Sequence, residues 1–371
     1  MDRTKWEQKR IEEVCDKASS NIVLNKIEDN VGDYPLYGAS GYVKSVDFFH
    51  MEQPYVGIVK DGAGVGRVGI YPAKSSLVGT MQYIIPKKGC MLQYLSYGLQ
   101  SLHLDKHVSG ATIPHIYFKN YGKDTIPFPP LSDQQAIVAE LDKLNEVIAL
   151  KRKQLVDLDS LAQSLFYEMF GDPVVNEKGW SLQKLETLCT HIVDCPHSTP
   201  KKTDKITQYP CIRTSELKGG NISWDTMQYL DEDEYNIRIA RLKPEAGDIV
   251  FGREGTIGDA VILPTGYFFS LGQRTMLLRA NETLVTNTFL HRVILSEWVK
   301  RHIRSVNVSS TVAHVNIKDF KLFNIPLPPL PLQQSFAAKV AKIEAEKQRV
   351  KASLKDLETL LASRMQYWFD N

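Results

Sequence analysis

"IPFPPLSDQQ" occupies residues 126–135, and "IPLPPLPLQQ" occupies residues 325–334 of the same chain. Each copy places two adjacent prolines shortly before a Gln-Gln pair. Proline cannot continue a helix toward the N-terminus, but it fits the first turn of one. Each stretch therefore predicts the start of a helix, and we expect the glutamine pair to pack on or bond to the opposite half of the protein.

The similarity extends beyond these ten residues. At a shift of 199 residues the neighbouring segments align without a gap, and the recurring pairs include Thr112/Thr311, His115/His314 and Lys119/Lys318. Further from the repeated stretch the copies diverge, as in "KDGAGVGRVGIY" (60–71) against "GREGTIGDAVIL" (252–263). The chain is therefore one unit used twice, with shared edges and different interiors.

Each copy has two parts that differ in amino-acid composition. Its first part is rich in Gly, Pro, Tyr and β-branched residues, and segments such as "YVGIVK" (55–60) and "GDIVFG" (247–252) predict short strands separated by turns. Its last part has no Gly or Pro over residues 133–170 or 332–369, which predicts two long helices.

Apolar positions in both predicted helices follow a 4-3 spacing, which is typical of a coiled coil. The first set is Ile137, Leu141, Leu144, Ile148, Lys151, Leu155, Leu158, Ala162, Leu165 and Met169. The second set is Phe336, Val340, Ile343, Lys347, Val350, Leu354, Leu357, Leu361, Arg364 and Trp368. Residues 133–170 hold seven acidic and four basic side chains, whereas residues 332–369 hold four acidic and seven basic ones. Opposite charge favours pairing of the two helices over packing of each on its own domain.

Bulk composition limits the class of protein. A length of 371 residues favours two domains, and 43% hydrophobic with 24% charged residues is ordinary for a globular protein. No apolar run is long enough to cross a bilayer, and the charged first 20 residues do not resemble a signal peptide. Five cysteines are too few for a disulfide framework, so we expect a cytoplasmic protein. A net charge of +2 means that any nucleic-acid binding depends on local basic groups.

Two variable parts, each followed by the same "IPxPPLxxQQ" boundary and a long helix, resemble the specificity subunit of type I restriction–modification systems. The resemblance covers essentially the whole chain. It implies an α+β fold in which two pseudo-two-fold related target-recognition domains are joined by two long antiparallel coiled-coil helices. The implied boundaries are recognition domains at residues 1–128 and 172–327, and spacer helices at residues 129–171 and 328–371.

The resemblance also implies function. Each recognition domain would read one half of an asymmetric, two-part site in double-stranded DNA, and the helices would set the spacer between the halves. Two modification (methyltransferase) subunits would dock on the protein, and restriction (translocase) subunits would join the full complex. The chain itself would have no catalytic residues, no cofactor, no metal and no membrane partner.

Two motifs suggest other functions. Residues 64–69 match the Gly-x-Gly-x-x-Gly dinucleotide pattern, but a strand-like segment interrupted by Pro72 follows instead of a helix, which favours a turn between strands. The stretch 189–197 brings two cysteines and two histidines together, but Cys189 matches Cys15 of the first copy, which favours a core residue over zinc binding. A nucleotide-dependent enzyme and a coiled-coil scaffold without a DNA role remain the alternatives.

Candidate DNA contacts are basic or hydrogen-bonding side chains in the variable loops. In the first copy they are Lys60, Arg67, Ser109, Thr112, His115 and Lys119. In the second copy they are Lys201, Lys202, Arg213, Arg253, Thr256, Gln273, Arg274, Ser309, Ser310, Thr311, His314 and Lys318. Positions shared by both copies are expected to hold phosphates or structure. Unshared positions such as Arg253, Gln273 and Arg274 are expected to contact bases.

Overall fold

A computed structural model describes residues 2–110, 112–254, 258–306 and 315–370, with only the backbone of residues 302–306. Contacts divide the chain into two compact units. Unit 1 comprises residues 1–153 and 351–371, and unit 2 comprises residues 154–350. Each unit therefore contains one variable part and a portion of both long helices.

Unit 1 contains a two-stranded sheet (β1-β9), a four-stranded sheet (β2-β8-β5-β6) and a three-stranded sheet (β4-β3-β7). Its strands are β1 Glu7–Arg10, β2 Cys15–Ser19, β3 Tyr34–Gly38, β4 Gly41–Val46, β5 Tyr55–Val59, β6 Val68–Tyr71, β7 Ser76–Leu77, β8 Met81–Pro86 and β9 Thr125–Phe128. Its short helices are η1 Arg3–Lys5, α1 Ile11–Val14, η2 Leu24–Lys26, α2 Leu92–Ser101, η3 Leu104–His107 and α3 Phe118–Tyr121.

Unit 2 repeats this arrangement with the sheets β10-β20, β11-β19-β16-β17 and β15-β12-β18, and adds the hairpin β13-β14. Its strands are β10 Ser181–Lys184, β11 Cys189–Asp194, β12 Pro210–Ile212, β13 Leu217–Lys218, β14 Asn221–Ile222, β15 Gln228–Tyr229, β16 Ile249–Gly252, β17 Ala260–Ile262, β18 Ser270–Leu271, β19 Thr275–Ala280 and β20 Asn324–Leu327. Its short helices are α5 Leu185–Leu188, η4 Thr214–Glu216, α6 Glu232–Arg238, α7 Asn287–Leu295, α8 Glu297–Val306 and α9 Ile317–Lys321.

Strand pairing gives the two units the same register. β5 pairs with β8 so that Val56 faces Ile84, and β16 pairs with β19 so that Ile249 faces Leu278. The three-stranded sheets also agree, because β3 pairs in parallel with β7 and β12 pairs in parallel with β18. The predicted duplication is therefore one topology built twice from different sequences.

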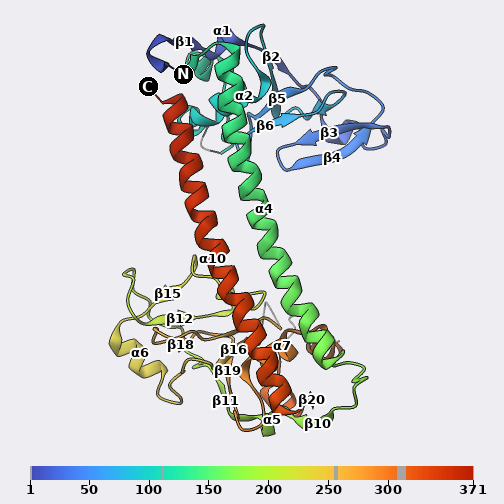
Figure 1. The fold of residues 1–371 in the computed structure, drawn as a ribbon, viewed down its shortest axis with the longest axis vertical. Helices are drawn as coiled ribbons and strands as arrows, with labels where there is room; N and C mark the ends of the chain where they lie inside the picture. Colours follow the sequence, from blue (N-terminus) through green and yellow to red (C-terminus); the bar gives the residue numbers. More distant parts are fainter. Residues whose placement is uncertain (1, 111, 255–257, 307–314, 371) are drawn as a thin grey trace. The chain divides into compact units, whose positions relative to one another are not determined.

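The two predicted long helices are confirmed as α4 (Leu131–Phe170) and α10 (Leu330–Phe369), drawn in green and red in Figure 1. α4 begins directly after Pro130, and α10 begins within the second repeat of the stretch, between Pro329 and Pro331. All twenty positions of the two 4-3 sets are buried or half-buried. The spacing thus identified the faces that the helices bury.

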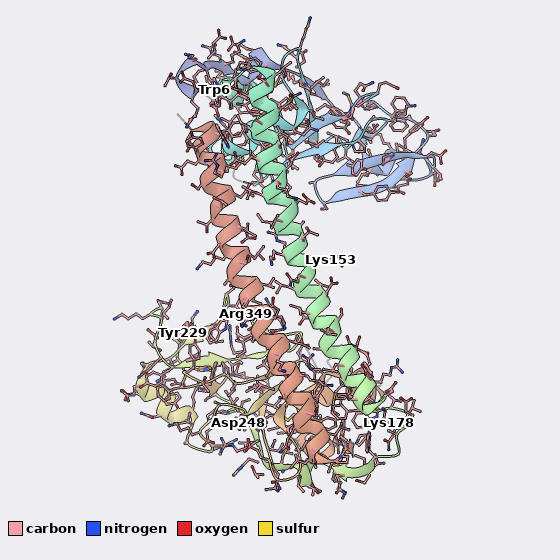
Figure 2. The ribbon with its side chains drawn as sticks, in the orientation of Figure 1. Trp6, Lys153, Lys178, Tyr229, Asp248 and Arg349 are labelled. Carbon is pink, nitrogen blue, oxygen red and sulfur yellow. The ribbon has the colours of Figure 1, made fainter. Side chains whose placement is uncertain are left out.

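Within unit 1 the first half of α4 runs antiparallel to the last part of α10. Glu140 accepts hydrogen bonds from Arg364 and from the Trp368 indole, and Arg152 bonds to Glu358 at 2.7 Å. As the numbers rise on one helix they fall on the other, which defines the direction. Trp6, labelled in Figure 2, stacks on Trp368 with ring centroids 5.9 Å apart and ties this helix end to the N-terminal segment.

Within unit 2 the last part of α4 runs antiparallel to the first part of α10. Phe166 contacts Phe336 edge-on, and the buried Lys347 bonds to Asp159 at 2.7 Å and to Glu344 at 3.0 Å. Lys347 thus occupies a position of the 4-3 pattern with its charge matched by two carboxylates. A buried amine of this kind is tolerated because it is paired.

Both helices also complete the domain cores. The core of unit 1 includes Ile137 and Leu141 from α4 together with Trp368 and Phe369 from α10. The core of unit 2 includes the ends of the same helices in the reverse combination: Phe166 and Phe170 from α4, and Phe336 and Val340 from α10. Pairing of the helices and packing on a domain, treated above as alternatives, therefore occur together.

A buried histidine in α7 makes the stability of unit 2 depend on pH. The Nε2 of His291 lies 2.9 Å from the Ala260 carbonyl, and burial lowers the pKa of the ring to about 4. The unfolded chain takes up this proton near pH 6.5, whereas the folded protein resists it until about pH 4. The contribution to stability is thus complete above pH 6.5 and is lost as the pH falls toward 4, by about 3 kcal/mol.

Urea unfolding of wild type and His291→Gln over this pH range checks the expectation. Glutamine keeps an N–H donor for the Ala260 carbonyl but does not titrate, so the variant should lose about 3 kcal/mol less than wild type on acidification. Parallel curves for the two proteins would contradict the assignment.

Candidate nucleic-acid interface

Three separate segments meet at the end of β5 in unit 1. The Lys60 N–H donates to the Thr80 carbonyl at 3.0 Å, and the Ile116 N–H donates to the Lys60 carbonyl at 2.9 Å. These bonds join the β5–β6 turn, the β7–β8 turn and the loop that contains residues 109–116. The sequence had placed candidate contacts in the first and third of these segments.

Unit 2 contains the same junction at the end of β16. The Arg253 N–H donates to the Arg274 carbonyl at 2.8 Å, and the Val315 N–H donates to the Arg253 carbonyl at 3.1 Å. Arg253 therefore corresponds to Lys60, and Arg274 corresponds to Thr80. A basic residue at the strand end is common to both units, whereas the residue on the neighbouring turn differs.

The glycine-rich stretch of unit 1 is a tight connection between β5 and β6. Gly62, Gly64 and Gly66 all have positive φ angles of 84° to 86°, which suit glycine. A strand follows, so the geometry is that of a turn between strands and differs from the strand–turn–helix of a dinucleotide site. Exposed Arg67 crosses this turn and donates to the Ala39 carbonyl at 2.8 Å.

The third segment and the adjoining helix α3 present four of the sequence-predicted residues. Ser109 and His115 pair through their backbones, and Thr112 is exposed between them. Exposed Lys119 lies over the Tyr117 ring at 5.2 Å, and His115 packs edge-on against that ring. The loop therefore gathers hydrogen-bonding, basic and aromatic groups on one short surface, the combination that contacts phosphates and bases.

Arg253 has a different environment from the one expected for a base-reading side chain. Its side chain is 9% exposed, and its Nη1 lies 3.2 Å from the Asp194 carboxylate. The Nε of Arg253 and the Oδ1 of Asp194 are buried without a hydrogen-bond partner within the described residues. The Arg253 guanidinium is therefore held inside the junction by Asp194.

Gln273 and Arg274 lie on the adjoining β18–β19 turn. The Gln273 amide donates to Thr199 Oγ1 at 3.2 Å and to the His197 carbonyl at 3.4 Å. The Arg274 side chain is 64% exposed, and its Nε lies 3.2 Å from Glu254. Gln273 thus fixes a neighbouring loop, while Arg274 projects from the surface.

Arg213 is also engaged inside its domain. Its guanidinium donates to the fully buried Glu216 at 2.7 Å and to the Thr226 carbonyl at 2.9 Å. Lys201, Lys202 and Lys318 are exposed, whereas Thr256, Ser309, Ser310, Thr311 and His314 lie outside the described residues. Arg213 therefore has a structural role that its sequence context did not reveal.

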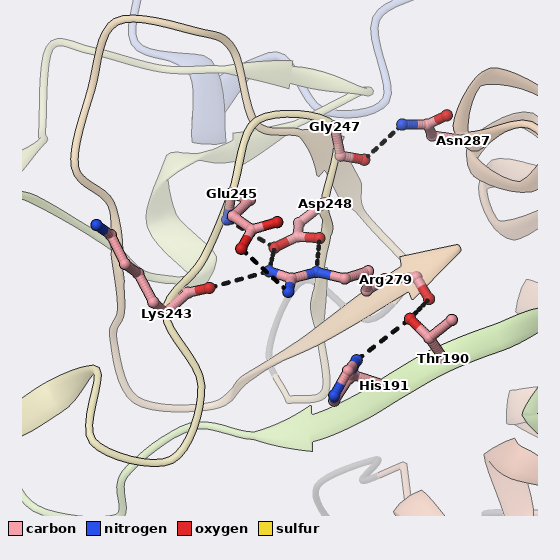
Figure 3. A network of polar contacts seen from close by, with 8 residues as sticks. All are labelled: Thr190, His191, Lys243, Glu245, Gly247, Asp248, Arg279 and Asn287. Carbon is pink, nitrogen blue, oxygen red and sulfur yellow. Dashed lines mark hydrogen bonds and ion pairs between the residues drawn. The ribbon is translucent and has the colours of Figure 1, made fainter. Parts of the chain in front are cut away.

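The start of β16 is held by a polar network that sequence reasoning missed. Asp248 is almost fully buried and accepts two hydrogen bonds of 2.8 Å from Arg279, which raise the pKa of that guanidinium (Figure 3). Arg279 also donates to the Lys243 carbonyl, and Asn287 of α7 donates to the Gly247 carbonyl. The strand that carries Arg253 at its far end is thereby anchored at its beginning.

The first glutamine of each repeated pair has a local role. Gln134 is fully buried and bonds to Met91, Gly89 and Pro129, and Gln333 makes the equivalent bonds to Thr286, Leu284 and Pro328. Each amide joins the start of a long helix to the start of α2 or α7. Among the described residues, all the hydrogen bonds that these two side chains make stay within their own unit.

The cysteines and histidines at residues 189–197 do not form a common site. Cys189 and Cys195 are buried in different core clusters, and burial raises the pKa of both thiols. No group of three metal-ligating side chains occurs in the described part of the chain. Nor does any described helix combine the length and apolar character that crossing a membrane requires.

Comparison with known proteins decides the family. The model of the type I restriction modification DNA specificity domain matches residues 3–159 and again residues 177–358. The chain belongs to this family. It contains two copies of the specificity domain, in agreement with the resemblance drawn from its repeated boundary.

Relatives of this specificity-subunit family align along most of the chain. The MjaVIII specificity subunit of Methanocaldococcus jannaschii is 22% identical over 81% of this chain and 76% of its own length. The MjaIX specificity subunit of the same organism is 21% identical over 89% and 85%. The crystal structure of the type I S subunit from M. genitalium matches with a TM-score of 0.61 and 14% identity, over 99% of this chain and 96% of that one. At that identity the match supports the fold.

Proposed function

We propose that the protein is the DNA-reading subunit of a type I restriction–modification enzyme, in which each unit reads one half of an asymmetric, two-part site. The observation that carries the proposal is the junction at the end of β5 and of β16. There the same backbone bonds bring variable connecting segments together in both units. A backbone arrangement that is common to both units but carries different side chains is suited to the recognition of two different DNA sequences.

In this proposal the variable parts, residues 1–128 and 172–327, recognise DNA. The long helices, residues 129–171 and 328–371, set the spacing between the half-sites. Among the candidate contacts, the exposed side chains are those of Arg67, Ser109, Thr112, Lys119, Lys201, Lys202, Arg274 and Lys318. The less exposed candidates around them are Lys60, His115, Arg213, Arg253 and Gln273. Thr256, Ser309, Ser310, Thr311 and His314 complete the set as expectations from the sequence.

Catalysis in this proposal belongs to partner proteins. Two modification subunits dock on the specificity subunit and methylate adenine, restriction subunits join the full complex, and the assembly acts in the cytoplasm. The specificity subunit contributes no catalytic residue and no cofactor. Support comes from the relatives, which are named as specificity subunits, and from the turn geometry of residues 62–67, which differs from a nucleotide-binding loop.

Selection from randomised duplex DNA tests the proposal. The full chain is mixed with the modification subunits of the same system, and bound duplexes are sequenced. Enrichment of two short motifs at a fixed separation is expected. Enrichment of a single continuous motif would contradict the two-reader proposal, and methyl transfer by the purified chain alone would contradict the non-catalytic role.

A further inference from the structure

The strongest unassigned feature is the pairing of Arg274 with Glu254 on the surface of unit 2. The Arg274 Nε lies 3.2 Å from a Glu254 carboxylate oxygen, and the two side chains are 64% and 25% exposed. No hydrogen bond within the described residues engages the Nη1 or Nη2 atoms of Arg274. The Glu254 carboxylate therefore holds the Nε side of the guanidinium, and the fork formed by Nη1 and Nη2 is left to bind a ligand.

The backbone beneath Arg274 is held in place and strained. Arg274 has a φ of 65°, in the left-handed region that non-glycine residues seldom occupy. The neighbouring Gly272 cannot be replaced, because a Cβ there would lie 2.3 Å from Arg213 Cγ and 2.9 Å from the Ile212 carbonyl. Such strain persists only where the surroundings enforce it, and it concentrates at functional sites.

A buried ion pair braces the same turn from below. Arg253 bonds through its backbone to the Arg274 carbonyl, and its side chain is fixed by Asp194, which also lies 3.3 Å from His197 Nε2. Gln273 then ties the turn to the loop that begins at His197. Arg274 is thus presented by a rigid support, as precise base recognition requires.

Unit 1 lacks this cation. Its equivalent junction places Asp61 next to Lys60, as Glu254 stands next to Arg253, but Thr80 occupies the position of Arg274. The acidic residue is common to both units and the exposed guanidinium is present in one. This difference is expected of a residue that distinguishes one half-site from the other.

We infer that Arg274 reads a guanine in the half-site recognised by unit 2, with Glu254 as a positioning residue that aims its guanidinium fork. The inference rests on the proposed function. A free two-nitrogen fork matches guanine O6 and N7 in the major groove, the commonest specific contact between arginine and DNA. Arg253, which the sequence ranked with Arg274 as a base contact, becomes part of the support.

Substitution at both positions tests the inference by sequencing methylated DNA from cells that carry the full system. Arg274→Ala removes the guanidinium fork, so one guanine position in one half-site should become degenerate, with preference for guanine reduced about 5- to 150-fold. Glu254→Ala should relax the same position more weakly. Glu254→Gln, which still accepts a hydrogen bond from Nε, should restore most of the preference.

Glu186→Gln is the matched control, because Glu186 is an exposed partner of Lys184 away from this turn. It should leave the motif unchanged. An unchanged motif in Arg274→Ala and Glu254→Ala would overturn the inference, and so would an equal loss of methylation on every sequence with an unaltered urea unfolding midpoint. Absence of any two-part motif in wild type would instead reject the proposed function.

Discussion

Lengthening both long helices by one heptad is expected to increase the spacer between the two half-sites by about three base pairs and to leave the half-sites unchanged. Seven residues add about 10 Å to a helix, and one base pair of B-DNA rises about 3.4 Å. Duplicating residues 147–153 after Lys153 in α4 and residues 351–357 before Lys351 in α10 preserves the 4-3 spacing in both. Lys153 and Arg349, close to the two insertion points, are labelled in Figure 2.

The insertion in α4 alone is the control for this expectation. It shifts the 4-3 positions of α4 by about two turns relative to those of α10. The contacts between the two helices described in unit 1 and those described in unit 2 then cannot form together. We expect the single insertion to abolish sequence-specific methylation. A double insertion that alters the half-sites and keeps the spacer would show that the helices do not set the separation.

Replacing Gln333 with leucine is expected to destabilise unit 2 by about 3 kcal/mol or more. The substitution leaves the Thr286 N–H and the carbonyls of Leu284 and Pro328 without this partner, and each buried unsatisfied group costs about 1–3 kcal/mol. The neighbouring Gln334 is exposed, so Gln334→Leu is a matched control that should change the free energy of unfolding by less than about 0.5 kcal/mol.

Urea unfolding monitored by circular dichroism measures both variants. The same comparison can be made in unit 1 with Gln134→Leu and exposed Gln135→Leu, where the lost bonds are to Met91, Gly89 and Pro129. Equal stability of the buried and exposed variants within each pair would mean that the glutamine amides do not hold the helix starts.

The features that the sequence predicted well are periodic or repeated. The absence of Gly and Pro over 133–170 and 332–369, with a 4-3 apolar spacing, predicted helices that the structure places at Leu131–Phe170 and Leu330–Phe369. The duplicated boundary predicted two units of one kind. Such signals lie within the local chain, where propensity and periodicity act.

The features that the sequence could not predict depend on partners distant in the chain. Arg253 lies in an open, glycine-rich context, and nothing near it indicates that Asp194 neutralises it in a buried site. Arg213 pairs with nearby Glu216, but the sequence does not indicate that Glu216 is fully buried or that Arg213 packs against Gly272. For Gln134 and Gln333 the sequence indicated a role at the helix starts, but it did not indicate hydrogen bonds to loops of the same unit.

Sequencing the methylated bases of the host genome with and without this gene tests the central claim most directly. With the gene present, we predict adenine methylation at a motif of two short, unlike halves separated by a fixed number of unspecified bases. Deletion of the gene should remove that motif and no other, and its return from a plasmid should restore it. Persistence of the two-part motif in the deletion strain would contradict the claim that this chain reads DNA.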